Sequence, residues 1–447
     1  MNTYPREDAL RLADRCLSLT KADDAEVFVY STASYLTRFA GNRIHQNVGE
    51  ENLQVSVRAV LGRRVGVAGT NRMDDAGLAE CCEAAATAAR NAPEDPGFPG
   101  LPEPVAVATP DRGSERTLGF DARQRGAAAH AMIDQSAVRG MTAAGKVEVS
   151  ANTIAIANTR GVRVAMPVTS AAASVLSMGT RGGSGWADFT GADVGDLAAE
   201  ALGDQAASLA QLSEDPAALA AGAYTVLLAP DAVGTLLDFL SYTGFSAKAV
   251  AEGSSFMAGH IGEQVLSERV TIIDDAHAAD ALGLTFDFEG VGKQPTVIVE
   301  DGALVQPVTD SYWAARTGKP NTGHALPAPN SFGPMPLDLR LEAGDTAEDE
   351  MLTSVKRGVY VTRFHYMNVE DPVRALFTGM TRDGTFLIEN GRLTKPVKNL
   401  RFTQSGVDAF ANVIAVGRER RFAGDGGSPS LVPSVLIEGF HFTGQTR

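Results

Sequence analysis

Cysteine is scarce in this chain, and long apolar runs are missing. The 447 residues include only three cysteines, Cys16, Cys81 and Cys82. An odd number with two adjacent positions is no disulfide framework, so we expect all three to stay reduced and buried. Because no run of 18 apolar residues occurs, no membrane-spanning helix is expected. The first ten residues also lack the basic-then-apolar pattern of a signal peptide, so the sequence predicts a cytoplasmic protein.

Basic residues are outnumbered by acidic ones. The sequence has 39 Lys and Arg against 54 Asp and Glu, which gives a formal net charge of −15. Proteins that bind nucleic acids need clustered Lys and Arg, so this balance argues against a nucleic-acid partner. With 44% apolar and 21% charged residues, the composition is otherwise typical of a soluble globular protein.

Several common catalytic motifs are absent as well. The stretch "GVGKQ" (290–294) has the Gly-Lys of a phosphate-binding loop but neither its upstream glycine nor its hydroxyl residue. The stretch "GGSGW" (182–186) lacks the last glycine of a nucleophile elbow. No two of the seven histidines lie within about one helical turn of each other, which excludes a zinc-binding helix with paired imidazoles.

What is present indicates two domains. A chain of 447 residues is longer than one hydrophobic core usually serves. The polar, alanine-rich segment 213–222 is a plausible linker, so we expect domains at 1–219 and 220–447. The first half mixes helical patterns, as at 5–19, with alternating strand-like runs, as at 53–70. The sequence therefore predicts an α+β protein with an N-terminal α/β domain.

The second half is richer in strands and in tight turns. A compact apolar strand at 224–230 precedes a helical pattern that includes Asp238. Asp301-Gly302, Asp383-Gly384 and Asn390-Gly391 each stand between strand-like runs, and such pairs supply the positive φ angles of hairpin turns. We therefore expect a C-terminal β-rich domain with an antiparallel, barrel-like sheet.

A few polar residues could line a functional groove. His260 and His324 both lie in glycine-flanked turns, "AGHIGE" and "NTGHAL". In "TFDFEG", Asp287 and Glu289 alternate with phenylalanines, which predicts that both carboxylates share one face of a strand. Paired carboxylates can act as general acid and base. The alternative for each of these residues is a structural or solvated role.

Five segments taken together resemble the TldD/PmbA family. They are "RFAGNRIHQNVGEENLQVSVRAVLGRRVGVAGTNRMDD", "GSSFMAGHIGEQVLSERVTIIDD", "GLTFDFEGV", "DSYWAARTGKPNTGHA" and "TFLIENGRLTKPV". The resemblance covers almost the whole chain in order. It implies an N-terminal α/β domain, a β-rich C-terminal domain, and dimers that enclose a central cavity.

The resemblance also bears on zinc. Catalytic chains of this family carry H-E-x-x-x-H before a glycine-rich segment, and a later cysteine completes the zinc site. The matching positions here are Asp238, Phe239 and Thr243, and no cysteine follows Cys82. The resemblance therefore implies a TldE/PmbA-like subunit with no catalytic residue, metal or cofactor of its own. Its partner would be a TldD-like chain that holds zinc, in a complex that degrades or trims unfolded peptides.

Glycine turns and exposed strand edges can bind an extended peptide through its backbone. We therefore expect the peptide groove to be lined by Ser254, Gly259, His260, Gly262, Asp287, Glu289, Gly323 and His324. Two alternatives stay open. One is a self-sufficient hydrolase that uses His260, His324, Asp287 or Glu289, and the other is a homodimeric protein that binds peptides without cleaving them.

Overall fold

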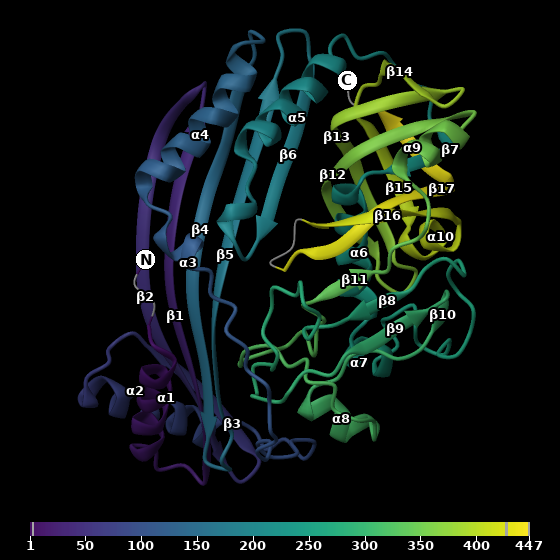
Figure 1. Cartoon of the computed structure of the whole chain (residues 1–447). Coiled ribbons are helices and arrows are strands. Elements are labelled where there is room, and N and C mark those ends of the chain that lie inside the picture. The colour runs from purple at the N-terminus through teal and green to yellow at the C-terminus, as the bar shows by residue number, and fades with distance from the viewer. Residues whose placement is uncertain (2–3, 425–427, 446–447) are drawn as a thin grey trace.

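The computed structural model describes residues 1, 4–424 and 428–445, which form two separate β-sheets (Figure 1). One sheet belongs to the N-terminal half and the other to the C-terminal half. The predicted α+β class with two domains is therefore confirmed. The first sheet ends at Gly191 and the second begins at Gly222. We therefore propose that the domain boundary lies between residues 219 and 220, as expected from the sequence.

The N-terminal sheet is antiparallel throughout, with the strand order β3-β2-β1-β4-β5-β6. Its long central strands are joined by very short turns. Gly41 and Asn42 connect the first two strands, and both have a φ of 59°, which glycine and asparagine tolerate best. The strands are β1 (Asp24–Ala40), β2 (Arg43–Leu61), β3 (Arg64–Thr70), β4 (Thr142–Asn158), β5 (Arg163–Met178) and β6 (Ser184–Gly191).

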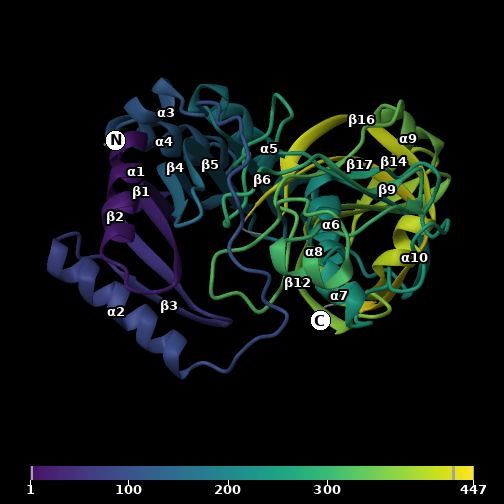
Figure 2. The ribbon, with the colours of Figure 1, turned by 90° about the horizontal axis from the view of Figure 1, so that it is seen from below.

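Helices pack on this sheet through small apolar residues. Asp74 begins the second helix because its side chain accepts a hydrogen bond from the Gly77 amide, as an N-cap residue should. Figure 2 shows α1 and α4 on the side of the sheet that faces away from the barrel. The helical elements are α1 (Arg6–Ser18), α2 (Asp75–Asn91), α3 (Glu115–Gly119), α4 (Ala122–Ala137), the 3-10 helix η1 (Val194–Asp196) and α5 (Ala199–Leu212).

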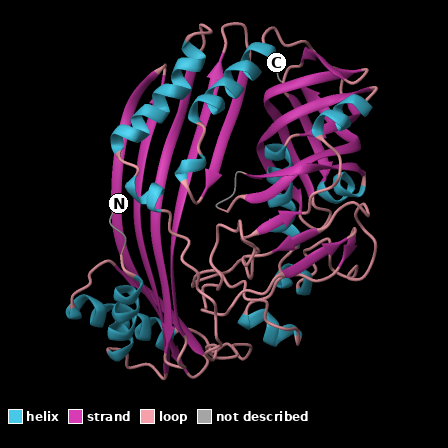
Figure 3. Ribbon diagram, in the orientation of Figure 1, coloured by secondary structure: helices cyan, strands magenta, loops and turns pink. Residues whose placement is uncertain are grey.

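The C-terminal sheet closes on itself. Strands β7, β12, β13, β15 and β17 pair in that order, and β17 pairs back with β7, so the predicted barrel-like sheet is confirmed (Figure 3). These pairings are antiparallel as predicted, except that β7 and β12 run parallel. The strands are β7 (Gly222–Leu228), β8 (Ile272–Asp274), β9 (Thr296–Glu300), β10 (Ala303–Leu304), β11 (Leu339–Leu341), β12 (Arg357–Asp371), β13 (Leu376–Glu389), β14 (Arg392–Pro396), β15 (Leu400–Ser405), β16 (Val413–Ala423) and β17 (Ser430–Gln445).

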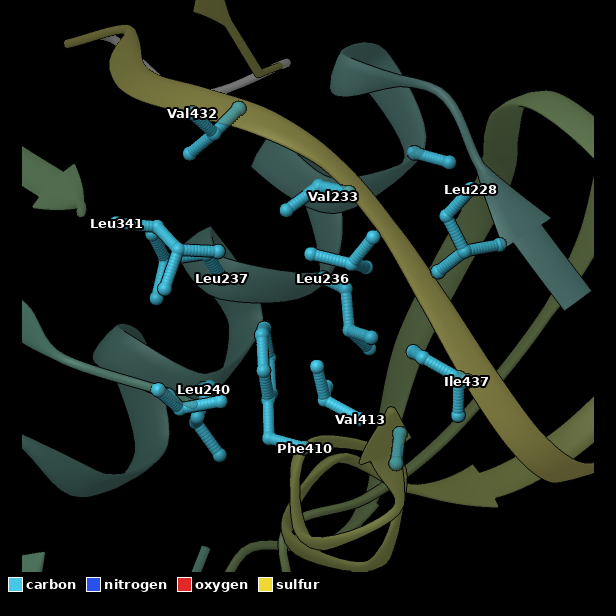
Figure 4. Close-up of a cluster of buried hydrophobic side chains, with 14 of the residues drawn as sticks. Leu228, Val233, Leu236, Leu237, Leu240, Leu341, Phe410, Val413, Val432 and Ile437 are labelled. Carbon is cyan, nitrogen blue, oxygen red and sulfur yellow. The ribbon is translucent and has the colours of Figure 1, made fainter. Parts of the chain in front are cut away.

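Helix α6 (Pro230–Gly244) fills the barrel core. It begins directly after β7 with a proline in its first turn, where the missing amide costs nothing. Leu236, Leu237 and Leu240 are fully buried against strand residues such as Ile437 (Figure 4). Burial of each leucine contributes about 1.5–3 kcal/mol, so α6 is anchored firmly. The other helices of this half are α7 (Ala247–Ala251), α8 (Ser311–Thr317), α9 (Glu348–Ser354) and α10 (Gly406–Ala411).

One predicted hairpin turn is wrong. Asp383 and Gly384 have positive φ angles of 56° and 116°, but they lie inside β13, where its register with β12 shifts. The buried Asp383 carboxylate pairs with Arg363, and the Thr362 hydroxyl lies 3.0 Å from the Asp383 carbonyl oxygen. These side chains hold a β-bulge where the Asp-Gly pair alone suggested a turn.

The two halves meet along the open face and one edge of the N-terminal sheet. Phe286 packs against Ile156 and Met166 of that sheet. At the sheet edge, Arg421 of β16 pairs with Asp188 of β6 at 3.0 Å. Among the described residues, no helix is long and apolar enough to cross a membrane.

Candidate functional site

Asp238 of helix α6 lines a cleft. Its carboxylate is already in contact with neighbouring residues, so it is not free to act as a simple metal ligand. Ser430 Oγ donates a hydrogen bond to Asp238 Oδ1 at 3.1 Å. A Cβ added to Gly424 would lie 2.5 Å from Asp238 Oδ2, so the chain passes close to this carboxylate. Asp238 is thus held by its neighbours on β17 and at the end of β16.

The other two positions of the zinc motif make contacts within the fold. The ring of Phe239 packs edge-on against Phe377, with ring centres 5.6 Å apart. Thr243 is buried, and its hydroxyl donates to the Phe239 carbonyl oxygen of the same helix at 2.9 Å. A zinc site needs three or four nitrogen, sulfur or oxygen ligands. One engaged carboxylate, a phenyl ring and an engaged hydroxyl do not fit a zinc ion.

A cleft of about 340 Å³ lies beside α6, and most of its lining is apolar. No histidine or cysteine is among its described lining residues. Over all described residues, moreover, no three His, Cys, Asp or Glu side chains gather closely enough to hold a metal ion. The lining residues are Thr235, Asp238, Phe239, Ser241, Tyr242, Met335, Pro336, Leu337, Leu339, Ser428 and Ser430.

Two further cavities continue this cleft. A second cavity of about 360 Å³ shares Tyr242 and Met335 with the first. A third, of about 670 Å³, shares Lys248 and Ser331 with the second and reaches the N-terminal domain. Together the three form what we call the α6–α7 groove. One wall is α6 and α7, and the other is the segment 326–337.

The middle of the groove offers two exposed aromatic rings. Ser246 Oγ lies nearby without a hydrogen-bond partner among the described residues, but it is shut off from solvent and does not open into the cavity. Tyr242 and Phe332 are 53% and 59% exposed, and their ring centres lie 6.3 Å apart. An apolar or aromatic side chain of a ligand could pack on this pair.

Two residues predicted for the groove line it. Ser254 lines the second cavity, and Glu289 lines the third. Glu289 Oε1 pairs with Arg58 of β2 at 3.0 Å, and Arg58 also pairs with Glu26 of β1 at 2.8 Å. Burial raises the pKa of Glu26 to about 7, against the opposing effect of Arg58. The far end of the groove is therefore a charged contact between the two domains.

The prediction that Asp287 and Glu289 share one strand face is wrong. Phe286 makes only an isolated bridge with Gly292, and the chain turns at Gly290. Asp287 is buried and accepts the amide of Ala325 at 2.9 Å, whereas Glu289 points to Arg58. A turn places the two side chains in different surroundings, although the Glu289 amide still donates to Asp287 Oδ1 at 3.0 Å.

The remaining predicted residues lie outside the lining of the groove. Gly259, His260 and Gly262 belong to an exposed turn, where His260 Nδ1 pairs with Glu263 at 2.7 Å. His324 is buried, and its ring nitrogens lie 2.9 Å from Thr322 Oγ1 and 3.0 Å from Asp274 Oδ1.

Gly323 has a steric role beside His324. Its φ is 73°, and an added Cβ would lie 2.7 Å from the Gly292 carbonyl oxygen. Only glycine combines this backbone angle with so close an approach. Together with the bonds of His324, this contact holds the backbone of the loop in place.

Sequence reasoning missed the second wall of the groove. The segment 326–337 reads "LPAPNSFGPMPL", and its prolines indicate only an irregular loop. Phe332 and Met335 could have been noticed as apolar residues in a loop, which is unusual for a solvated turn. Ser246 and Tyr242 could not have been singled out from the sequence, because serine and tyrosine are both common near helix ends.

Two family models match this chain. The family model described as the PmbA/TldA metallopeptidase C-terminal domain matches residues 221–444. The model of PmbA/TldA metallopeptidase domain 1 matches residues 25–89. This chain belongs to the PmbA/TldD family. The resemblance seen in the sequence is confirmed.

Relatives within the PmbA/TldD family are named as metalloproteases. The chain is 32% identical over 225 residues to a metalloprotease TldD homolog of Haemophilus influenzae, covering 50% of this chain and 46% of the relative. It is 29% identical over 174 residues to metalloprotease PmbA of Escherichia coli O157:H7, covering 38% and 36%. The chain thus spans about half the length, or less, of the curated relatives it matches.

The fold resembles that of a solved family member over its whole length. The crystal structure of TldE from Thermococcus kodakarensis superposes with a TM-score of 0.88 and 20% sequence identity. The match covers 98% of this chain and 99% of that one. At this identity, the likeness establishes the shared two-domain architecture.

Proposed function

We propose that this chain is a non-catalytic, TldE/PmbA-like subunit of a zinc-dependent peptidase complex that degrades or trims unfolded peptides or peptide precursors. The observation that carries the proposal is helix α6. It lies in the core of a metallopeptidase-family domain, but Phe239 and Thr243 stand at the motif positions and make contacts within the fold. Zinc and the water-activating carboxylate would belong to a TldD-like partner chain.

The α6–α7 groove supports a peptide-binding role. Ligand sites are usually apolar clefts with a few convergent polar groups. The first cavity of the groove is mostly apolar and suits an apolar side chain. In the second, the exposed rings of Tyr242 and Phe332 lie 6.3 Å apart and would pack on an apolar or aromatic side chain of the peptide. An extended, unfolded peptide along the groove would meet both.

A peptide-binding measurement tests this role. We expect a fluorescent, unstructured peptide to bind the purified chain and Tyr242→Ala to weaken that binding about tenfold, since a stacked aromatic contact and its buried area contribute about 1–2 kcal/mol. Tyr366 is an exposed tyrosine outside the groove, so Tyr366→Ala is the matched control. Equal affinities for the two variants would contradict the location of the site.

A reconstitution experiment tests the division of labour. We expect the chain alone to hold no stoichiometric zinc and to cleave nothing. Mixed with a TldD-like chain, it should support cleavage of the peptide, and a chelator should abolish that cleavage. Binding without cleavage in the mixture would favour the homodimeric binding protein. Cleavage by this chain alone, with chelator present, would show a self-sufficient hydrolase.

A further inference from the structure

Strand β3 ends the N-terminal sheet at the boundary between the two domains. Strand β2 pairs with one side of it over residues 64–70, and within the described residues no strand pairs with the other side. Helix α2 packs on one face of β3, where a Cβ added to Gly66 would lie 2.1 Å from the Ala89 amide nitrogen. In Figure 2, β3 lies between α2 and the C-terminal half. The outer edge of β3 is therefore without a partner strand.

The register shows which backbone groups of β3 point away from β2. A two-residue turn joins Leu61 to Arg64. Residues that close such a hairpin bond each other, so Arg64 faces β2. Successive residues alternate sides, and the β2–β3 register is regular throughout. The amide and carbonyl groups of Val65, Val67 and Gly69 therefore point away from the sheet.

The third cavity of the α6–α7 groove reaches this edge. Val65 and Val67 of β3 line it, and so do Arg58 of β2 and Ala88 of α2. Arg58 pairs with Glu289 and thus lies on the face turned to the C-terminal domain, whereas α2 covers the other face. The turn residues 62–63 are not among the described lining residues. A cavity lined from both faces, but not at the turn, passes around the outer edge of β3.

Charged side chains of this cavity already have partners. Lys248 pairs with Glu252 at 2.8 Å, and Glu289 pairs with Arg58 at 3.0 Å. The Asp310 carboxylate accepts a backbone amide at the start of α8. A charged ligand would have to compete with these contacts. The open amide and carbonyl groups of β3 instead suit the main chain of an extended peptide, which binds a strand edge with little regard to its sequence.

The cavity also has room for the side chains of such a peptide. Its volume is about 670 Å³, which is typical of ligand sites. Successive side chains of an added strand point to opposite faces of the sheet. Half of them would face the C-terminal domain, where the rings of Tyr312 and Trp313 line the cavity with their centres 5.5 Å apart. The other half would face Ala88 of α2.

From these observations, we propose that an extended peptide adds to the N-terminal sheet at the outer edge of β3 and bonds the main chain of Val65 and Val67. Each of these residues offers one donor and one acceptor. The third cavity shares Lys248 and Ser331 with the second, so the same peptide would continue past α7 toward Tyr242. The inference rests on the proposed function and adds the strand that docks the peptide backbone.

Proline substitution at the edge tests the docking. Val67→Pro removes one outward amide, and edge strands tolerate proline where the amide points away from the sheet. We expect Val67→Pro to bind the fluorescent, unstructured peptide about tenfold more weakly than wild type, because a main-chain hydrogen bond is lost and the ring hinders the approach of a strand. Gly69→Pro is the matched control. Its amide also points outward, but Gly69 does not line the cavity, so the affinity should not change.

A second measurement leaves the protein unaltered. In an added strand, only every second amide points to β3. A short peptide of alternating leucine and serine should turn its leucines to the rings of Tyr312 and Trp313, which fixes the set of amides that faces β3. N-methylation of either the leucine amides or the serine amides removes one set of donors. We expect one modified peptide to bind wild type about tenfold more weakly and the other to bind as tightly as the unmodified peptide. Equal affinities of the two modified peptides would overturn the proposal.

The remaining outcomes separate this inference from the proposed function. If Tyr242→Ala weakens binding and Val67→Pro does not, the peptide lies in the groove without docking on β3, and only this inference fails. The inference also fails if Gly69→Pro weakens binding as much as Val67→Pro, because proline then acts through the fold. If wild type binds no peptide at all, the peptide-binding role fails together with the docking strand.

Discussion

Asp238, Phe239 and Thr243 each make a contact that stabilises the fold, so catalytic groups cannot be restored there by simple exchange. The variant Asp238→His, Phe239→Glu, Thr243→His would supply two imidazoles and a carboxylate. It would also lose the Phe239–Phe377 ring contact and place a charge beside the barrel core. We expect it to fold with about 3 kcal/mol less stability. Because no cysteine follows Cys82 to supply the third ligand of the family motif, it should bind zinc weakly and cleave no peptide.

The measurement combines urea unfolding, elemental analysis after dialysis, and peptide hydrolysis. Phe239→Glu alone is the control, because it carries most of the packing cost without either imidazole. A triple variant that retains one tightly held zinc would show that the groove provides a ligand that we have not identified.

The buried Asp287 carboxyl should make the stability of the protein depend on pH in a defined direction. Burial, and next the charge of Glu289, raise the pKa of Asp287 to about 8, although backbone amides donate to its carboxyl oxygens. The folded state therefore binds more protons than the unfolded state between the ordinary aspartate pKa and about 8. In that range the free energy of unfolding falls as pH rises, by at most about 1.4 kcal/mol per pH unit.

We expect Asp287→Asn to flatten this pH dependence. Asparagine cannot ionise, but its amide group would face the Ala325 amide, which costs about 1–3 kcal/mol. Urea unfolding of wild type and variant at pH 5 and pH 8 provides the test. A variant whose stability falls with pH as steeply as that of wild type would show that Asp287 is not the titrating group.

Helices α1 and α2 share a core that hides all three thiols. Cys16 Sγ lies 3.6 Å from Cys82 Sγ, and all three cysteines are buried. Burial raises the pKa of Cys81 to about 11, and a buried, protonated thiol is a poor nucleophile. We expect no thiol to react with a disulfide reagent in the native protein and all three to react after unfolding in urea. A single fast-reacting thiol in native protein would contradict this packing.

The elements themselves could largely be predicted from local patterns. Helix 5–19 and the hairpin 53–70 correspond to α1 and to the β2–β3 pair, because their apolar periodicity matches the faces they bury. Asn390-Gly391 forms its turn between β13 and β14. Asp383-Gly384 does not, because Arg363, twenty residues away, holds its carboxylate. A distant partner leaves no mark in the local pattern.

The candidate site was less predictable for the same reason. The zinc-motif positions on α6 followed from the family resemblance, and Ser254 and Glu289 line the groove. Its second wall is a proline-rich loop almost a hundred residues after α6, and its far end includes Arg58 of the other domain. Periodicity shows which face of an element is buried but not which distant segment covers it.

Arg58 couples the two domains and carries the last prediction. It pairs with Glu26 of its own sheet and with Glu289 of the C-terminal domain, and its side chain is 12% exposed. Arg58→Met would leave the buried Glu26 and Glu289 carboxylates without the guanidinium that pairs with both, which costs about 3–5 kcal/mol. The exposed Arg64–Glu94 pair is the matched control, and Arg64→Met should cost no more than about 1 kcal/mol.

The loss at Arg58 should depend on pH. Burial already raises the pKa of Glu26 to about 7, and removal of the guanidinium should raise it further. A buried carboxyl with a raised pKa destabilises the folded state less when it is protonated and therefore uncharged. The destabilisation by Arg58→Met should therefore be smaller at pH 5 than at pH 8. Calorimetry at both values tests this, and at pH 8 we expect the two domains to unfold in separate transitions. The contradicting result is a loss of stability that does not change with pH and equals that of Arg64→Met. The domains would then be held together by the other contacts, at Arg421 and along the sheet face that packs on Phe286.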